Sequence, residues 1–169
     1  MGVTNGNISS VPGSKDDLKN PKDDDLDCKE CEEERLLEKE EATQYRKVAA
    51  TLNYVAADRP DLQFSVKEAA RDMATPKVRS LKLLKRIARY LKGKPRLVLH
   101  YPWQDADIGI STYSDSDYAG CLRTRRSTSG GCVMIGRHLV KSFSKQQKVV
   151  ALSSGEADTH ALVFASCET

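Results

Sequence analysis

The chain has 169 residues, of which 39% are hydrophobic and 30% are charged. This length suits one domain, or one domain with an unfolded extension. No apolar run is long enough to span a membrane, and the N-terminus has no apolar signal core, so we expect neither a membrane protein nor a secreted one. The five cysteines are therefore expected to stay reduced.

The net charge of +3 hides two segments of opposite sign. Residues 15–41 hold 13 Asp and Glu against 6 Lys and Arg, whereas residues 42–169 hold 21 Lys and Arg against 11 Asp and Glu. This composition predicts a disordered acidic tail over residues 1–37, ahead of a basic folded body that suggests a polyanionic partner. Cys28 and Cys31 form a single C-x-x-C pair in the tail without the further ligands that zinc needs, so we expect the tail to be solvated.

Three helices are expected after the tail, within a helical segment over residues 38–95. Apolar residues recur at three- and four-residue spacing from about residue 38 to 57, which gives one apolar helix face. Pro60 suits the first turn of a second helix, which runs to about residue 73. A third helix is expected over about residues 77–92, where apolar residues again share a face.

The apolar pattern changes from helical spacing to alternation in the last part of the chain, residues 96–169. Four segments read as strands: residues 96–101, 108–115, 130–136 and 138–144. The last two are expected to form a hairpin that turns near Gly136-Arg137. A closing helix is expected over about residues 154–168, so the predicted fold class is α/β in the α+β sense, with a small antiparallel sheet.

The third helix is strongly basic. Residues 77–96 hold nine Lys and Arg and no acid. An ordinary solvated helix face mixes both signs, because opposite charges four residues apart stabilise a helix. A face of one sign repels itself, and a bound polyanion would offset that cost in a salt-sensitive way. The candidate nucleic-acid contacts on this helix are Lys82, Lys85, Arg86, Arg89 and Lys92, and the alternative is a solvated cationic face.

A second cationic group lies in an expected loop between strands, within "RTRRST" at residues 123–128. Arg123, Arg125 and Arg126 could grip a nucleic-acid backbone from that loop. The alternative is a loop that only keeps the protein soluble.

The stretch "TYSDSDYAG" places two carboxylates at the end of an expected strand. If the strand continued through both, Asp115 and Asp117 would point to the same face. If it stops at Asp115, Asp117 lies in the turn before Gly120 and suits an Asx-turn. Taken alone, the pattern favours the turn.

The closing helix contributes two further acids, in "SSGEADTHAL". Ser153 and Glu156 fit the S-x-x-E capping box, so Glu156 is expected to fold back onto the helix start. Asp158 is expected on the stripe that packs on the sheet. The apolar members of that stripe are Ala161, Leu162 and Ala165.

An inward carboxylate is costly unless a cation or hydrogen-bond donors accompany it. Asp115 at the strand end and Asp158 on the helix could therefore converge on a divalent metal, and oxygen ligands suit Mg²⁺. Such a constellation would fit metal-assisted phosphodiester hydrolysis.

Over about residues 41–169 the sequence resembles the Pol polyprotein of copia-type LTR retrotransposons. Five blocks occur in the family's order: "YRKVAATLNYVAADRPDLQFSV", "RIARYLKGK", "YSDSDYAG", "RRSTSGGCVMIG" and "SFSKQQKVVALSSGEAD". The resemblance implies that residues 41–95 are similar to the segment joining the reverse transcriptase to ribonuclease H. It also implies that the chain from about Leu97 onward is the start of a ribonuclease-H-like mixed sheet.

The resemblance also implies a chemistry. The family cleaves the RNA strand of an RNA–DNA hybrid with two divalent metal ions, Mg²⁺ or Mn²⁺, that carboxylates hold. It carries a catalytic, metal-binding role onto Asp115, and onto Asp158 at the second acid of the family's Glu-Ala-Glu block. The implied partners are the RNA–DNA hybrid and the rest of the Pol polyprotein, in the cytoplasm, in virus-like particles, or in the nucleus.

The sequence departs from the family at several positions. Asp158 is one methylene shorter than the usual Glu, His160 and its neighbour replace an aromatic and an aliphatic residue, and Phe143 stands where Trp is usual. The chain stops at Thr169, before the family's third acidic block. We therefore expect a truncated domain with little or no nuclease activity. The alternatives are a non-catalytic nucleic-acid-binding module and a decayed insertion that folds poorly because a sheet edge is unpaired.

Overall fold

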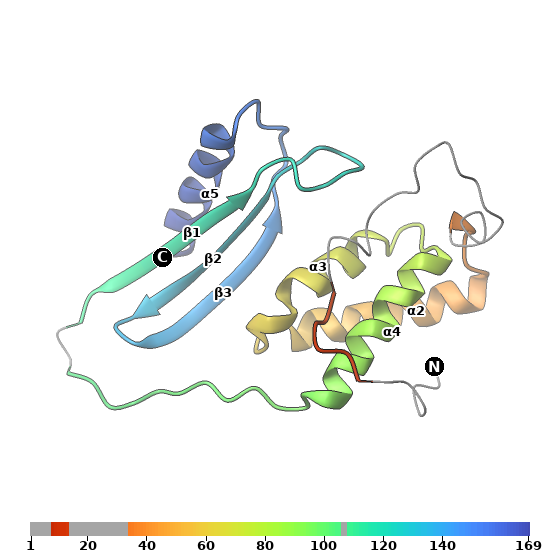
Figure 1. Cartoon of the computed structure of the whole chain (residues 1–169), viewed down its shortest axis with the longest axis horizontal. Coiled ribbons are helices and arrows are strands. Elements are labelled where there is room, and N and C mark those ends of the chain that lie inside the picture. Colours follow the sequence, from red (N-terminus) through yellow and green to blue (C-terminus); the bar gives the residue numbers. More distant parts are fainter. Residues whose placement is uncertain (1–7, 14–33, 106–107) are drawn as a thin grey trace. The chain divides into compact units, whose positions relative to one another are not determined.

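The computed structural model describes residues 8–13, 34–105 and 108–169 (Figure 1). The chain divides into two compact units, Met1–Leu97 and Val98–Thr169. Each unit is considered by itself below. None of the helices described here is long and apolar enough to cross a membrane.

The predicted acidic tail, residues 1–37, lies for the most part outside the described residues. Its last residues are ordered, because the backbones of Arg35 and Leu37 hydrogen-bond at 3.0 Å to residues 76–78. Leu36 also forms an isolated antiparallel bridge with that segment. The prediction of disorder is therefore wrong for residues 35–37.

Among the described residues, three α-helices build the first unit, as the apolar spacing predicts. They are α2 (Lys39–Val55), α3 (Gln63–Arg71) and α4 (Val78–Gly93). Pro60 opens a short 3₁₀ turn, η2 (Pro60–Leu62), directly before α3, since proline lacks the N–H that a first turn leaves unpaired. The apolar faces of the helices meet in one core, whose largest fully buried side chains are Tyr45, Leu62, Val66, Leu84 and Ile87.

A charged network joins the connection between α2 and α3 to the end of α4. The guanidinium of buried Arg59 donates to both carboxylate oxygens of Asp61, at 3.0 and 2.8 Å. The hydroxyl of Tyr90 donates to the same carboxylate at 2.8 Å. Arg59 also donates to the carbonyls of Lys94 and Pro95, which ties this turn to the residues that follow α4. The hydrogen bonds from Arg59 lower the pKa of Asp61, although burial opposes them.

The second unit is a three-stranded antiparallel sheet with one helix. Its strands are β1 (Ile110–Asp117), β2 (Thr128–Ile135) and β3 (His138–Gln146), in the order β1-β2-β3. Helix α5 (Ser154–Glu168) lies alongside β1 and β2 (Figure 1). Every strand pairing among the described residues is antiparallel, which corrects the mixed sheet implied by the resemblance.

The hairpin between β2 and β3 turns at Gly136-Arg137, as predicted. Gly136 has φ +56°, in the left-handed region that glycine adopts without strain. The side-chain amide of Gln104 supports the turn, since it donates to the Ile135 carbonyl at 2.8 Å and accepts the Arg137 N–H at 3.0 Å.

The strand predicted at residues 96–101 is wrong. Among the described residues this segment pairs with no strand, and it leaves Leu97 and Val98 exposed. Its end is fixed by a side chain, because the Tyr101 hydroxyl donates to the Leu139 carbonyl at 2.8 Å. Alternation of apolar residues indicates an extended segment, but a strand also needs a partner across the ladder.

Replacement of Asp61 by Asn should lower the free energy of unfolding by about 2 kcal/mol at neutral pH, because a charged hydrogen bond becomes a neutral one. The folded-state pKa of Asp61 lies below its ordinary value of 3.8. Its stabilisation is therefore fully present above that ordinary value and is lost as the pH falls through the folded-state pKa. Urea unfolding followed by helical circular dichroism should show the gap between wild type and variant closing in acid.

Asp58 provides the matched control, since it is an exposed carboxylate in the same connection. Asp58→Asn should change the free energy of unfolding by less than about 0.5 kcal/mol. Equal losses at the two positions would contradict a special role for the Arg59–Asp61 pair.

Candidate metal positions and nucleic-acid interface

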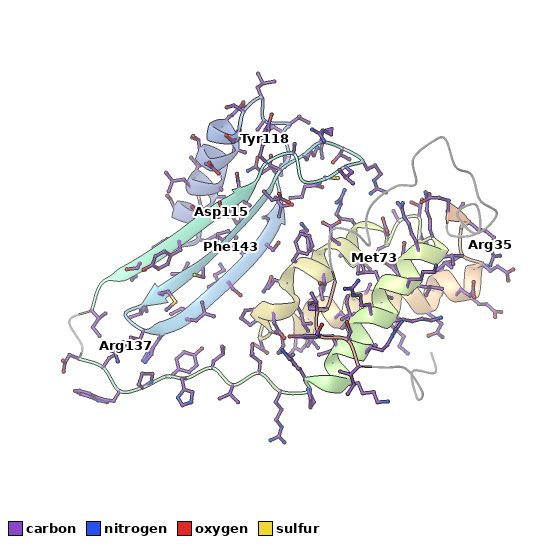
Figure 2. All side chains as sticks on the ribbon, in the orientation of Figure 1. Arg35, Met73, Asp115, Tyr118, Arg137 and Phe143 are labelled. Atoms are coloured by element: carbon purple, nitrogen blue, oxygen red, sulfur yellow. The ribbon has the colours of Figure 1, made fainter. Side chains whose placement is uncertain are left out.

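Asp115 lies inside β1, which runs on through Asp117 instead of ending at Asp115 (Figure 2). Burial alternates along this strand. Ser114 and Ser116 are half-buried, whereas Tyr113 and Asp115 are exposed. The strand therefore has one covered face and one open face.

The covered face is the one on which α5 packs. The hydroxyl of Ser116 donates to Oδ1 of Asp158 at 2.5 Å. Phe143 of β3 meets Phe164 of α5 edge to face, with ring centroids 5.1 Å apart. Successive side chains of a strand point to opposite faces, so the carboxylate of Asp115 lies on the face away from α5.

Asp115 and Asp158 are therefore not brought together. The two acids flank Ser116, one preceding it on the open face of β1 and the other contacting it from α5. Among the described residues, no group of three or more His, Cys, Asp or Glu is placed to hold a metal. Because a two-metal site needs several converging carboxylates, this arrangement does not fit one. The metal-binding roles of Asp115 and Asp158 stay predictions.

The stripe predicted to pack on the sheet is confirmed for Ala161 and Ala165 and is wrong for Asp158 and Leu162. Ala157, Ala161 and Ala165 are buried against the sheet, whereas Asp158 and Leu162 are exposed. An α-helix turns by 100° per residue, so a shift of one position moves a side chain off the packed face. Asp158 is thus a rim residue of the interface, held by one hydroxyl.

The capping role predicted for Glu156 is confirmed. The hydroxyl of Ser153 accepts the Glu156 N–H at 3.2 Å. The Glu156 carboxylate accepts the N–H of Leu152 at 2.7 Å, one residue before the expected partner. These two bonds pair backbone donors at the start of α5.

Asp117 belongs to both the strand and the turn that follows. It pairs with Thr128 across the sheet, and its carbonyl accepts the N–H of Gly120 at 3.2 Å. A β-carbon at position 120 would collide with the Asp117 carboxylate. A larger residue at position 120 would therefore require the Asp117 side chain to move. Asp117 opens the turn through its backbone carbonyl, and the Asx-turn expected of its side chain stays a prediction.

Gln147 is a structural residue that no sequence pattern indicated. This side chain is buried, and its amide donates to Oγ of Ser129 at 3.0 Å and to the carbonyl of Ala157 at 2.8 Å. It thus joins β2 to the first turn of α5, next to Asp158. Gln147 falls just after β3, where no apolar period marks which side chains are buried.

The candidate nucleic-acid residues on α4 lie on one side of the helix. The opposite side is buried and comprises Ser80, Leu83, Leu84, Ile87 and Tyr90. The cationic face of α4 is defined here as Lys82, Lys85, Arg86, Arg89 and Lys92. Its three lysines are exposed and its two arginines are half-buried. Spacings of three and four residues keep these cations together over about 15 Å of helix.

The loop arginines lie in the second unit, between β1 and β2. Arg123, Arg125 and Arg126 are all exposed. The loop is closed at its base, because the Arg125 N–H donates to the Cys121 carbonyl at 2.7 Å and the Cys121 N–H donates to the Arg126 carbonyl at 3.2 Å. Arg125 has φ +55°, an uncommon value outside glycine, so the loop holds a defined conformation.

Comparison with known proteins shows three informative similarities. The chain is 33% identical over 126 residues to an uncharacterized mitochondrial protein of Arabidopsis thaliana, covering 73% of this chain and 51% of that protein. It is 36% identical over 126 residues to the retrovirus-related Pol polyprotein from transposon RE1 of the same plant, covering 75% of this chain and 8% of that protein. It is 34% identical over 121 residues to the secreted RxLR effector protein 161 of Plasmopara viticola, covering 72% of this chain and 84% of that protein.

The chain thus spans about half the length of the mitochondrial relative and less than a tenth of the Pol polyprotein. No family model matches the sequence, and no solved structure matches it.

Asp158→Ala should lower the free energy of unfolding of the second unit by about 1 kcal/mol, because it removes the acceptor of the Ser116 hydroxyl. Asp115→Ala is the matched control, because Asp115 is an exposed acid on the open face of β1. It should change the free energy of unfolding by less than about 0.5 kcal/mol. Thermal unfolding of both variants checks the difference. A larger loss at Asp115 would contradict the assignment of the two faces.

Proposed function

Because the chain belongs to the copia-type retrotransposon Pol sequences, we propose that it binds nucleic acid through the cationic face of α4 and is related to ribonuclease H in its second unit. The preferred ligand is an RNA–DNA hybrid, the substrate implied by that family. The observation that carries the proposal is the separation of α4 into an apolar buried side and a cationic opposite side.

The cationic face is built to contact phosphates. It holds five cations over three turns, and residues 77–96 contain no acid. The aromatic residue of α4, Tyr90, is buried in the core and bonded to Asp61. Bases are usually held by stacking on exposed aromatic side chains, whereas phosphates are held by Lys and Arg. We therefore expect binding that depends on the backbone and little on base sequence.

The relation of the second unit to ribonuclease H is supported by the order of its elements. An antiparallel hairpin follows β1, and a helix follows the hairpin, with the family's two acid positions at Asp115 in β1 and Asp158 in α5. In such an enzyme, Mg²⁺ or Mn²⁺ would activate the water that attacks the phosphodiester. The two acids lie on different sides of β1, so we derive no catalytic step from them and propose binding without efficient cleavage.

The double variant Lys85→Gln/Arg89→Gln should weaken binding of a labelled RNA–DNA hybrid. The slope of log K against log salt should become shallower by about 0.9 for each phosphate that the variant no longer neutralises. Electrophoretic mobility shifts over a series of salt concentrations measure both quantities.

Lys47→Gln, singly and paired with Lys39→Gln, gives controls of matched charge on α2, where both lysines are exposed. Binding by the double control should stay close to wild type. If the two double variants lose affinity equally and their slopes of log K against log salt become equally shallow, net charge drives binding and α4 is not the interface.

Incubation of the chain with end-labelled hybrid and Mg²⁺ or Mn²⁺ should leave the RNA strand intact. The reason is that the described carboxylates do not converge on one site. Denaturing gels read the outcome directly. RNA cleavage by the wild-type chain that Asp115→Asn abolishes would overturn the proposal of binding without cleavage.

A further inference from the structure

Two cations at the start of α4 lie outside the cationic face defined above, and one carboxylate holds both. Nη1 of Arg79 donates to Oε1 of Glu34 at 2.5 Å, and the ammonium group of Lys77 donates to Oε2 of the same residue. Glu34 thus bridges a lysine and an arginine with its two oxygens.

This bridging arrangement presents the same donors that bind phosphate. Arginine and lysine bind phosphate oxygens and carboxylate oxygens alike, through short charge-assisted hydrogen bonds. Arg79 precedes Lys82 by three residues and Arg86 by seven, so it lies on the side of α4 that carries the cationic face. A nucleic-acid backbone following that face toward the helix start would meet Arg79 and Lys77 next.

Glu34 is held in place by backbone structure. The carbonyl of the next residue, Arg35, accepts the Val78 N–H at 3.0 Å, and the Leu37 N–H donates to the Pro76 carbonyl at 3.0 Å. These bonds fix the chain beside the first turn of α4. The carboxylate itself is open to a competing anion, because 36% of the Glu34 side chain is exposed to solvent.

The N-terminal part of the chain contacts the same helix at a second point. The carbonyl of Val11 accepts a hydrogen bond from Nε of Arg86 at 3.3 Å, and residue Gly13 lies against Leu83. A member of the cationic face therefore already has a partner from this part of the chain. The N-terminal residues and a bound polyanion would therefore compete for hydrogen-bond donors such as the Arg86 guanidinium.

We propose that Glu34 is an autoinhibitory carboxylate, which occupies a phosphate-binding pair formed by Lys77 and Arg79 and leaves it when a nucleic-acid backbone binds along α4. The inference rests on the proposed function of α4 and adds its regulation. Binding must displace the carboxylate, so the apparent affinity is lower than the intrinsic affinity of the open surface.

The test uses the full chain with Glu34→Gln and a labelled RNA–DNA hybrid. The neutral amide releases Lys77 and Arg79, so the affinity should rise about fivefold. The slope of log K against log salt should steepen by about 0.9, since one more phosphate is contacted. Glu40→Gln is the matched control, with the same charge change at an exposed acid in the first turn of α2, and should leave both values near wild type.

A triple variant locates the effect. Lys77→Gln and Arg79→Gln, added to Glu34→Gln, should abolish the gain in affinity and in slope. Circular dichroism of each chain checks that the helix content is unchanged. Glu34→Asp, which keeps the charge, is a second variant that should bind like wild type.

The outcomes separate this inference from the proposed function. An unchanged affinity in Glu34→Gln, together with a loss in Lys85→Gln/Arg89→Gln, would overturn the inference alone. Equal gains in Glu34→Gln and Glu40→Gln would also overturn it, because they would reflect net charge. Failure of every chain to bind the hybrid would overturn both.

Discussion

The first unit depends on the burial of one side of α4. Ile87 and Leu84 are inaccessible to solvent in the core shared by all three helices, and Tyr90 extends that side to the Arg59–Asp61 pair. With one side committed to the core, the remaining positions of α4 face outward, and there the sequence places lysine and arginine. The same helix therefore supplies the stability of the unit and the surface that we propose for nucleic acid.

In the second unit the alternation of β1 decides which residues can act together. Ser116 faces α5 and holds Asp158, so the preceding residue, Asp115, must face away from that helix. Asp158 lies at the exposed rim of the interface between α5 and the sheet. There its carboxylate accepts a hydrogen bond from the Ser116 hydroxyl and needs no buried cation as a partner. The contact of Asp158 with Ser116 therefore serves the packing of α5 on the sheet, and Gln147 fixes the same end of α5 from the sheet side.

The helices, the hairpin turn and the helix cap could be predicted from the sequence because they depend on residues close together in the chain. The spacing of apolar residues predicted α2, α3 and α4, Gly136 predicted the hairpin turn, and Ser153 with Glu156 predicted the cap of α5. The errors concern partners far away in sequence. Residues 96–101 alternate as a strand would but pair with no strand among the described residues. Asp158 was wrongly placed on the packed stripe of α5, because Leu162, Val163 and Phe164 follow one another and so put apolar residues on several sides of the helix.

The segment that follows α4 has a consequence for how this chain tolerates change. Each unit has its own packed interior, and the residues that join them form no ladder within the described part of the chain. Lengthening such a connection costs only the slowly growing entropy of a longer loop, and exposed connections are where chains accept insertions. The core around α4 is built from residues of the first unit alone, so a substitution at Asp115 or Asp158 removes none of its packing contacts.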